Sequence, residues 1–448
     1  MANHGHLSHL WLLIRPITGI SSMAEQPVIV QKISWSDLCP WTLIFKTFPV
    51  ASSITVLVLA VLGVVLTPMG WLLSESLLIN DELKKDHALM RVVEINRSPY
   101  LGVFSATGNQ IGLPKFMESP STGPRAVFQQ FVKPFELLFS RQTGVRRFLY
   151  FLIGCVWSIF VWSFVGVAIT RVSLLRLTRN ERIGIDDAFE FAWSKWMTTA
   201  GAIGIPLIAV LLLSIPAFLI GLLMGFDLGV VVAGVLWFVV LGCSIGMGLL
   251  LAGLMFGWPL MISSVGCEGQ NSFDAMTRAY AYVFQKPLQY ALYGGLAIVF
   301  GGFCWVLVAG LTEGIIGLSY WSTSWGANIT SSDRIQLVLD ANPVKDDSSE
   351  TLIGYGQNFI SLWTSLLKTV AAAFMYGLFW CMASAVYLLL RKDVDETEMD
   401  EIFISEEKRT YELPPLRSDE NGIPQVQEPM AVRPAVDIDD DHDSDASS

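Results

Sequence analysis

The stretch LGVVVAGVLWFVVLGCSIGMGLLLAGLMFGWPLMISSVGC, residues 228–267, decides the fold class. It holds no Asp, Glu, Lys or Arg and is mostly apolar, and a membrane-spanning helix needs roughly 20 such residues. Other charge-free stretches, each long enough to span a bilayer, occupy 47–74, 148–170, 196–226, 287–312 and 369–390. The sequence therefore predicts an all-α, polytopic integral membrane protein and excludes a soluble fold.

The composition favours the same class, because the 448 residues are 52% hydrophobic and only 15% charged, with a mean hydropathy of +0.51. A soluble domain carries about 25% charged residues. The formal net charge of −11 arises from residues 393–448, which hold 18 acidic and four basic side chains. Such an acidic tail is expected to be disordered. We expect a lipid bilayer as the main partner and no nucleic acid.

The predicted segments follow from where the charges stop and start. Tryptophan and phenylalanine at 33–50, and an amphipathic pattern at 127–139, predict two segments that lie on the membrane surface. The predicted order is an N-terminal extension at 1–32, with Met23 as an alternative start; the interfacial segment 33–50; a first span at 53–74; a hydrophilic loop at 75–147 that contains the interfacial helix 127–139; a second span at 148–170; an inner amphipathic helix at 171–197; spans at 199–224 and 230–260; a second inner helix at 264–287; a fifth span at 289–312; an outer loop at 313–367; a sixth span at 368–390; and the tail 391–448.

The distribution of Lys and Arg in the short loops predicts the orientation, since these residues concentrate on the cytoplasmic side. We expect the protein in the inner membrane of the cell, with both termini in the cytoplasm. In this orientation the inner segments are basic, and the short outer loops carry only Arg334 and Lys345. The loop 75–147 would lie outside although it is basic. Its length makes it largely exempt from the rule.

Two segments on the predicted inner side resemble each other. Asp187-Ala188 and Ala192-Trp193 are in register with Asp274-Ala275 and Ala279-Tyr280. Each segment follows one span and precedes another, which indicates a parallel internal repeat. Asp187 and Asp274 are predicted to cap the first turns of their helices, where unpaired backbone N–H groups favour an acceptor.

The run Gly166-Val167-Ala168-Ile169-Thr170-Arg171, followed by Glu181 and Asp187-Ala188, resembles a pattern in uncharacterised bacterial polytopic membrane proteins. In that pattern a span ends in small residues and Thr-Arg, and an acidic-Ala-aromatic helix follows. The run from Gly257-Trp258-Pro259-Leu260 to Ser272-Phe273-Asp274-Ala275 is similar to its second half. The resemblance covers about 150–300. It implies a membrane fold and no particular activity, so no catalytic residue is carried over.

Small residues and a few charges provide the candidate contact sites. GxxxG spacings allow two helix backbones to approach closely, either within this chain or between two copies; they occur at Gly242–Gly246, Gly253–Gly257 and Gly310–Gly314. Glu313 and Lys368 lie near the outer ends of the fifth and sixth spans. We expect them at similar depth, where they could form an ion pair at the outer interface.

The sequence lacks the usual catalytic motifs, such as HExxH, GxSxG and the phosphate-binding loop. It also predicts no cofactor and no metal site. The favoured interpretation is a non-enzymatic scaffold or membrane-complex subunit that binds a cytoplasmic or membrane protein, in an oligomeric state that the sequence leaves open. The alternative is a transporter or permease subunit for a small amphipathic solute.

The orientation can be tested with a reporter enzyme that is active only in the cytoplasm. Fused after residue 395, the reporter should be active, because an even number of spans returns the chain to the side on which it began. An inactive reporter in a stably expressed fusion would contradict the predicted orientation.

Overall fold

The computed structural model describes residues 39–79, 89–90, 92–93, 96, 124–138, 144–330, 352–397, 402, 417–418 and 424–425. The chain divides into two units, Met1–Ile402 and Phe403–Ser448. In the second unit, β1 (Arg417–Ser418) pairs antiparallel with β2 (Pro424–Gln425). The predicted N-terminal extension at 1–32 and most of the predicted tail lie outside the described residues.

The described part of the first unit is helical, and six of its helices are long and apolar enough to cross a membrane. This confirms an all-α, multi-pass membrane protein. The six helices are α3 (Ile54–Leu78), α7 (Val145–Thr178), α8 (Ile185–Leu223), α10 (Trp237–Glu268), α12 (Pro287–Thr330) and α14 (Leu352–Asp395). The shorter ones are η1 (Pro40–Lys46), α2 (Thr47–Ala51), α6 (Pro124–Leu138), α9 (Asp227–Val235) and α11 (Ser272–Gln285).

The predicted inner helix at 171–197 is corrected, since it is not one separate element. Its first part continues α7 to Thr178, and its last part is the start of α8, which runs without a break into the third span. Between them the chain turns at Asn180, whose φ of 56° is one that asparagine tolerates better than most residues. By contrast α11 is a separate helix, because Lys286 precedes Pro287 and adopts an extended φ of −129°.

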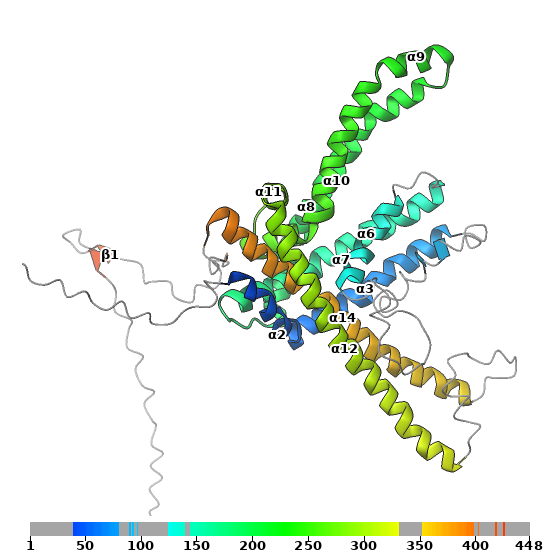
Figure 1. The fold of residues 1–448 in the computed structure, drawn as a ribbon, viewed down its shortest axis with the longest axis vertical. Helices are drawn as coiled ribbons and strands as arrows, with labels where there is room; N and C mark the ends of the chain where they lie inside the picture. Colours follow the sequence, from blue (N-terminus) through cyan, green and yellow to red (C-terminus); the bar gives the residue numbers. More distant parts are fainter. Residues whose placement is uncertain are drawn as a thin grey trace, which may run out of the picture. The chain divides into compact units, whose positions relative to one another are not determined.

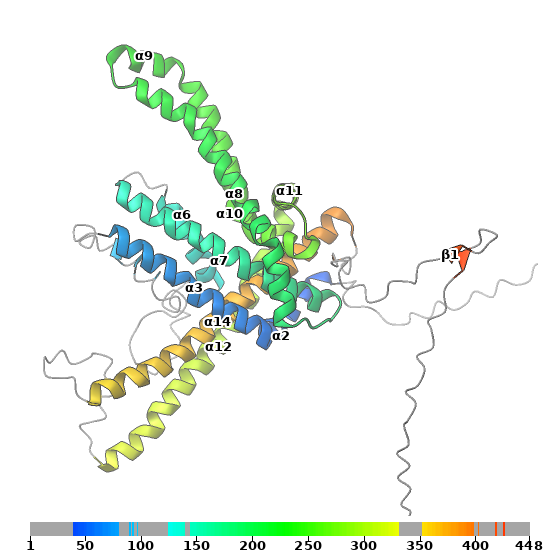
Figure 2. The ribbon, with the colours of Figure 1, turned by 180° about the vertical axis from the view of Figure 1, so that it is seen from behind.

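The long helices form pairs that diverge from a common region. Figures 1 and 2 both show α8 and α10 running together to α9, away from α3 and α7, while α12 and α14 run together in another direction. The end of the bundle that carries α11 is here called the α11 end. It also holds the C-terminal ends of α10 and α14, where Glu268 and Asp395 pair with Arg278 of α11. Arg171 of α7 donates to the Gly266 carbonyl of α10 at 3.2 Å nearby.

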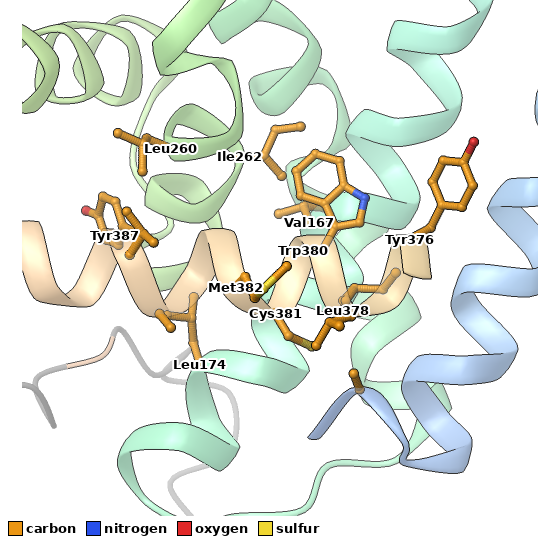
Figure 3. Packing of buried hydrophobic residues seen from close by; sticks show 14 of the residues in the cluster. Val167, Leu174, Leu260, Ile262, Tyr376, Leu378, Trp380, Cys381, Met382 and Tyr387 are labelled. Atoms are coloured by element: carbon orange, nitrogen blue, oxygen red, sulfur yellow. The ribbon is translucent and has the colours of Figure 1, made fainter. Parts of the chain in front are cut away.

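The centre of the bundle is a hydrophobic core built around α14. Trp380 and Tyr387 are among its largest fully buried side chains. Figure 3 shows Trp380 rising from α14 beside Ile262 of α10 and Val167 of α7, with Tyr376 further along α14. The predicted interfacial segment 33–50, described from residue 39 on, also contributes to this core: Ile44 and Val50 are buried, and Phe45 contacts Phe300 of α12 at 4.9 Å between ring centroids. The segment carries apolar side chains on more than one side, which explains why it packs into the core and does not only lie on the membrane surface.

Helices α3 and α7 interlock through two tryptophans that each lie on a glycine of the other helix. A Cβ added at Gly154 would lie 2.1 Å from the Trp71 ring, and one added at Gly70 would lie 2.1 Å from the Trp157 ring. The Trp157 indole also donates a hydrogen bond to the Leu66 carbonyl at 3.0 Å. Close packing of this kind depends on residues without a side chain.

Replacing Gly154 by alanine should therefore destabilise the protein by about 1–3 kcal/mol, the usual cost of overpacking. Trp71 is only 3% exposed and has little room to move. Gly204→Ala is the matched control, because a Cβ there meets nothing within 4 Å. The measurement is the temperature at which the detergent-solubilised protein loses its monodisperse peak; equal melting temperatures for the two variants would contradict the interlock.

Candidate functional site

The short helix α6 lies at the middle of the bundle instead of on the membrane surface, where the sequence had placed the helix 127–139. Its Phe131 ring lies 5.2 Å from Trp162 and 4.9 Å from Trp258, between ring centroids. It also contacts Tyr376 and Trp380, at 6.0 and 6.3 Å. All four partners come from the interior of charge-free stretches, so Phe131 lies near mid-span.

From this depth α6 runs toward the start of α7. Phe135 and Leu138, near its C-terminal end, pack against a second cluster that includes Trp71 and Tyr150. A helix of 15 residues is about 22 Å long, shorter than the roughly 30 Å hydrocarbon core of a bilayer. Helix α6 is thus a short helix that enters the bundle and is too short to cross the bilayer.

A cavity of about 320 Å³ lies beside α6. Its wall is formed by residues of α3, α6, α7, α8, α10 and α14, and most of the side chains are apolar or aromatic, among them Phe131, Trp162, Leu207, Leu254 and Trp258. Pockets that bind small molecules span about 300–1,000 Å³ and have mostly apolar walls with a few placed polar groups. The cavity therefore has the size and the wall of a small-ligand site.

Three of the wall side chains carry buried N–H groups with no partner among the described residues: Trp162 Nε1, Trp258 Nε1 and Asn96 Nδ2. A buried donor without an acceptor costs about 1–3 kcal/mol, and native proteins retain few of them. These N–H atoms have almost no accessible area, so they lie behind the cavity surface, which is mostly apolar.

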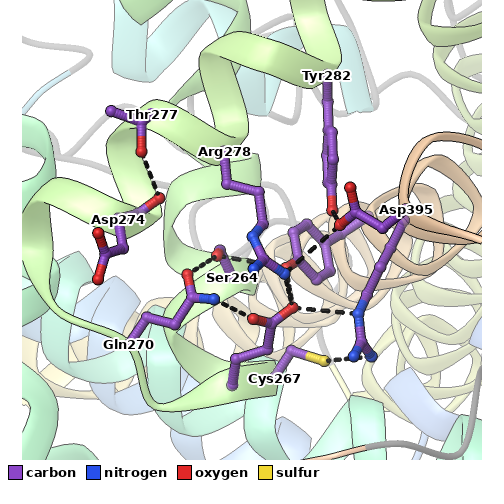
Figure 4. A network of polar contacts seen from close by, with 11 residues as sticks. Ser264, Cys267, Gln270, Asp274, Thr277, Arg278, Tyr282 and Asp395 are labelled. Atoms are coloured by element: carbon purple, nitrogen blue, oxygen red, sulfur yellow. Dashed lines mark hydrogen bonds and ion pairs between the residues drawn. The ribbon is translucent and has the colours of Figure 1, made fainter. Parts of the chain in front are cut away.

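The α11 end is held together by a polar network around Glu268, the last residue of α10 (Figure 4). Its carboxylate pairs with Arg278 of α11 and, at 3.1 Å, with the Nε of Arg391 of α14. The Tyr387 hydroxyl donates to it at 3.0 Å, and the Gln270 amide donates to its other oxygen. The Arg391 side chain is 8% exposed and that of Glu268 14%, so Arg391 is buried and Glu268 is largely shielded from solvent.

The network extends to the end of α14 through α11. Arg278 lies 3.5 Å from Asp395, and the Tyr282 hydroxyl donates to the same carboxylate. Burial and this hydrogen bond raise the pKa of Tyr282 above its ordinary value, so the phenol stays protonated and donates. Burial alone would lower the pKa of Arg278, but Tyr387 and Glu268 raise it, so the guanidinium stays charged.

The two predicted repeat segments contact each other at this end. Lys195 donates to the Gly269 carbonyl at 2.6 Å, and Ser272 donates to the Thr198 carbonyl at 2.8 Å. All four matching alanines are fully buried: Ala188, Ala192, Ala275 and Ala279. The aromatic positions differ, since Trp193 is exposed while the Tyr280 ring packs on Gly253. The repeat itself stays a prediction.

The predicted capping role of Asp187 and Asp274 is corrected. The N-cap residues are Gly184 and Asn271, and neither helix start has a side-chain capping bond. Both aspartates instead occupy the third helical position of their helices, because each helix begins three residues earlier than a capping role for the aspartate requires. There a negative charge still interacts favourably with the helix dipole.

Only one of the three GxxxG spacings packs within the described chain. A Cβ at Gly253 would overlap the Tyr280 ring at 2.0 Å, and one at Gly257 would lie 3.7 Å from Ala279. A Cβ added at Gly242, Gly310 or Gly314 meets nothing within 4 Å, and one at Gly246 meets only Leu213, at 3.5 Å.

Glu313 and Lys368 lie at ion-pair distance, with 3.7 Å between the carboxylate oxygen and the ammonium nitrogen. Their side chains are 45% and 29% exposed. An ion pair of this exposure contributes little to stability. It links the middle parts of α12 and α14.

Neither the cavity nor the network was predicted from the sequence. Glu268 and Arg391 were detectable in principle, because each is the first charge after a charge-free stretch and both therefore end spans at the same side. The convergence of Phe131, Trp162 and Trp258 had no such signal, since these residues lie far apart in the chain and aromatic residues are common in membrane helices.

No protein-family model, curated protein or solved structure matches the chain. The fold and the site thus define a class, a multi-pass α-helical membrane protein, and the activity has to be argued from the geometry.

The network predicts a large difference between two charge removals. Glu268→Ala leaves Arg391 and Arg278 without their shared carboxylate and should destabilise the protein by about 3–5 kcal/mol. Glu313→Ala, which breaks a half-exposed pair, should cost no more than about 1 kcal/mol. Melting temperatures in detergent test this; similar values for the two variants would show that the buried network does not hold the α11 end together.

Proposed function

We propose that the protein is a transporter or permease subunit that binds a small amphipathic solute in the cavity beside α6. The observation that carries the proposal is the position of α6. A helix that does not span the bilayer is tolerated at membrane depth where it is buried in protein or lines a water-filled space. Helices that end inside the membrane also recur at solute sites near the middle of transporters.

The two faces of α6 support this assignment. The face that carries Phe131 is buried among aromatic rings. The other face carries Lys133 and Glu136, which form an exposed ion pair at 2.9 Å. Charged side chains at such depth face the bundle interior or water instead of lipid. Water therefore reaches this face of α6 from the far end of the bundle, and a solute can take the same route to the cavity.

A second candidate function, the scaffold or membrane-complex subunit favoured by the sequence, is supported by a different observation. The glycine faces at Gly242, Gly310 and Gly314 have no neighbour among the described residues. Such faces allow a helix of a partner, or of a second copy, to approach closely.

Solute flux separates the two functions. The full chain in liposomes should release a trapped neutral amphipathic dye several-fold faster than protein-free liposomes. Leu207→Trp fills the cavity and should return release to background, because Leu207 is part of the wall. The matched control is Ile208→Trp on the same helix, where the side chain is 59% exposed and outside the cavity.

Wild-type protein that releases no dye would contradict the transport proposal, as would release that Leu207→Trp leaves unchanged. Absence of flux together with a reproducible membrane partner captured in mild detergent would favour the scaffold.

A further inference from the structure

The cavity beside α6 has one charged group in its wall. Glu136 is the only charged residue that lines it in the described part of the chain. The Glu136 side chain is 65% exposed, so its carboxylate is accessible and is not sealed behind the wall. A negative charge at the wall repels anions and attracts cations. The sign of this charge therefore distinguishes between solutes of similar size and shape.

This carboxylate lies within the hydrocarbon part of the bilayer. Glu136 follows Phe131, which lies near mid-span, by five residues, or at most about 7.5 Å along the axis of α6. Half of the hydrocarbon core is about 15 Å thick. Charged side chains at such depth are rare and mark the paths of solutes or ions. The depth of Glu136 thus indicates a solute contact.

The ion pair with Lys133 leaves the carboxylate available. Lys133 contacts Oε2 of Glu136 at 2.9 Å, and no described residue pairs with Oε1. The lysine side chain is 54% exposed and does not line the cavity. A pair of this exposure contributes little to stability, and the two oxygens of a carboxylate offer about four acceptor sites. A second cation can therefore bind the carboxylate from the cavity side.

The rest of the accessible wall suits the apolar part of a solute. Phe131, Phe135, Leu207 and Leu251 line the cavity and are each partly exposed. Phe135 directly precedes Glu136, so an aromatic ring and the carboxylate are neighbours on α6. The faces of aromatic rings carry partial negative charge and attract ammonium groups. The cavity thus combines a negative, partly aromatic end with an apolar remainder.

We propose, resting on the cavity assigned under the proposed function, that its preferred ligand is a free amphipathic amine. The protonated amine pairs with the Glu136 carboxylate, and its apolar chain or ring occupies the space between α6, α8 and α10. A cavity of about 320 Å³ is at the lower end of the range for small-molecule sites. This size favours a single-chain amine over a lipid with two acyl chains.

The test is equilibrium dialysis of two radiolabelled probes, 4-phenylbutylamine and 4-phenylbutanol, against the full chain in mild detergent, with detergent alone as the blank. The probes share one apolar body, and only the amine carries a positive charge at neutral pH. The amine should bind saturably and about tenfold more tightly than the alcohol, the effect of one hydrogen bond to a charged group.

Three charge variants locate the site. Glu136→Gln keeps the shape of the side chain and removes its charge, so it should weaken amine binding about tenfold and leave alcohol binding unchanged. Lys133→Gln should strengthen amine binding by up to about fivefold, because it removes the competing cation. Glu313→Gln is the matched control and should change nothing, since Glu313 also pairs with a lysine but does not line the cavity. The cavity-filling Leu207→Trp should abolish binding of both probes.

The inference is overturned if the amine binds no more tightly than the alcohol, if Glu313→Gln weakens amine binding as much as Glu136→Gln, or if Lys133→Gln also weakens it. Should Glu136→Gln fail to give a monodisperse peak, Lys133→Gln decides. Displacement of the bound amine by a short-chain phosphatidylethanolamine would overturn the assignment to a free solute in favour of a lipid headgroup. Selective amine binding without dye flux would support this inference and contradict transport, whereas dye flux without a preference for the amine would do the reverse.

Discussion

The arrangement of the helices depends on one buried carboxylate. Glu268 joins α10, α11 and α14 at the α11 end, where it accepts from Arg278, Tyr387 and Gln270 and forms an ion pair with Arg391. Burying charges is costly unless they are paired, and here both carboxylate oxygens have donors. With this end fixed, the helix pairs can diverge toward their far ends, as Figure 1 shows, without separating from one another.

The divergence creates the room that α6 occupies. A bundle of six parallel and antiparallel spans packed along their whole length would leave no space for a further helix at mid-span. Here Phe131 enters between α7, α10 and α14 and is surrounded by rings from all three. The same divergence leaves the cavity, because the short helix α6 cannot fill the whole space between its diverging neighbours. The site thus follows from the divergence of the helix pairs away from the fixed α11 end.

The spans were predictable from the sequence, but the site was not. Charge-free stretches locate the six long helices because burying a charge in lipid is costly. Each stretch shows this by itself, without knowledge of its neighbours in the fold. The depth of α6 depends on the helices that it packs against. Its apolar face fits a lipid surface as well as a ring of aromatic side chains, so the sequence alone does not decide between them. The glycine spacings show the same limit, since Gly253–Gly257 meets Tyr280 while Gly310–Gly314, with identical spacing, meets nothing in the described chain. The aspartates were predicted in the correct helical turn but at the wrong position. Which residue is the N-cap depends on where the backbone enters the helix, and the sequence does not fix this to a single residue.

The cavity itself favours a ligand over an interior that serves packing alone. Protein interiors are packed at nearly crystalline density, and a space of this size in a bundle that only needed to be rigid would be filled by larger side chains at Leu207 or Leu254. A cavity in the packing loses contacts that side chains would otherwise make. This cost falls when an apolar molecule enters and makes those contacts. The scaffold interpretation accounts for the open glycine faces but not for the cavity, which a ligand site would explain.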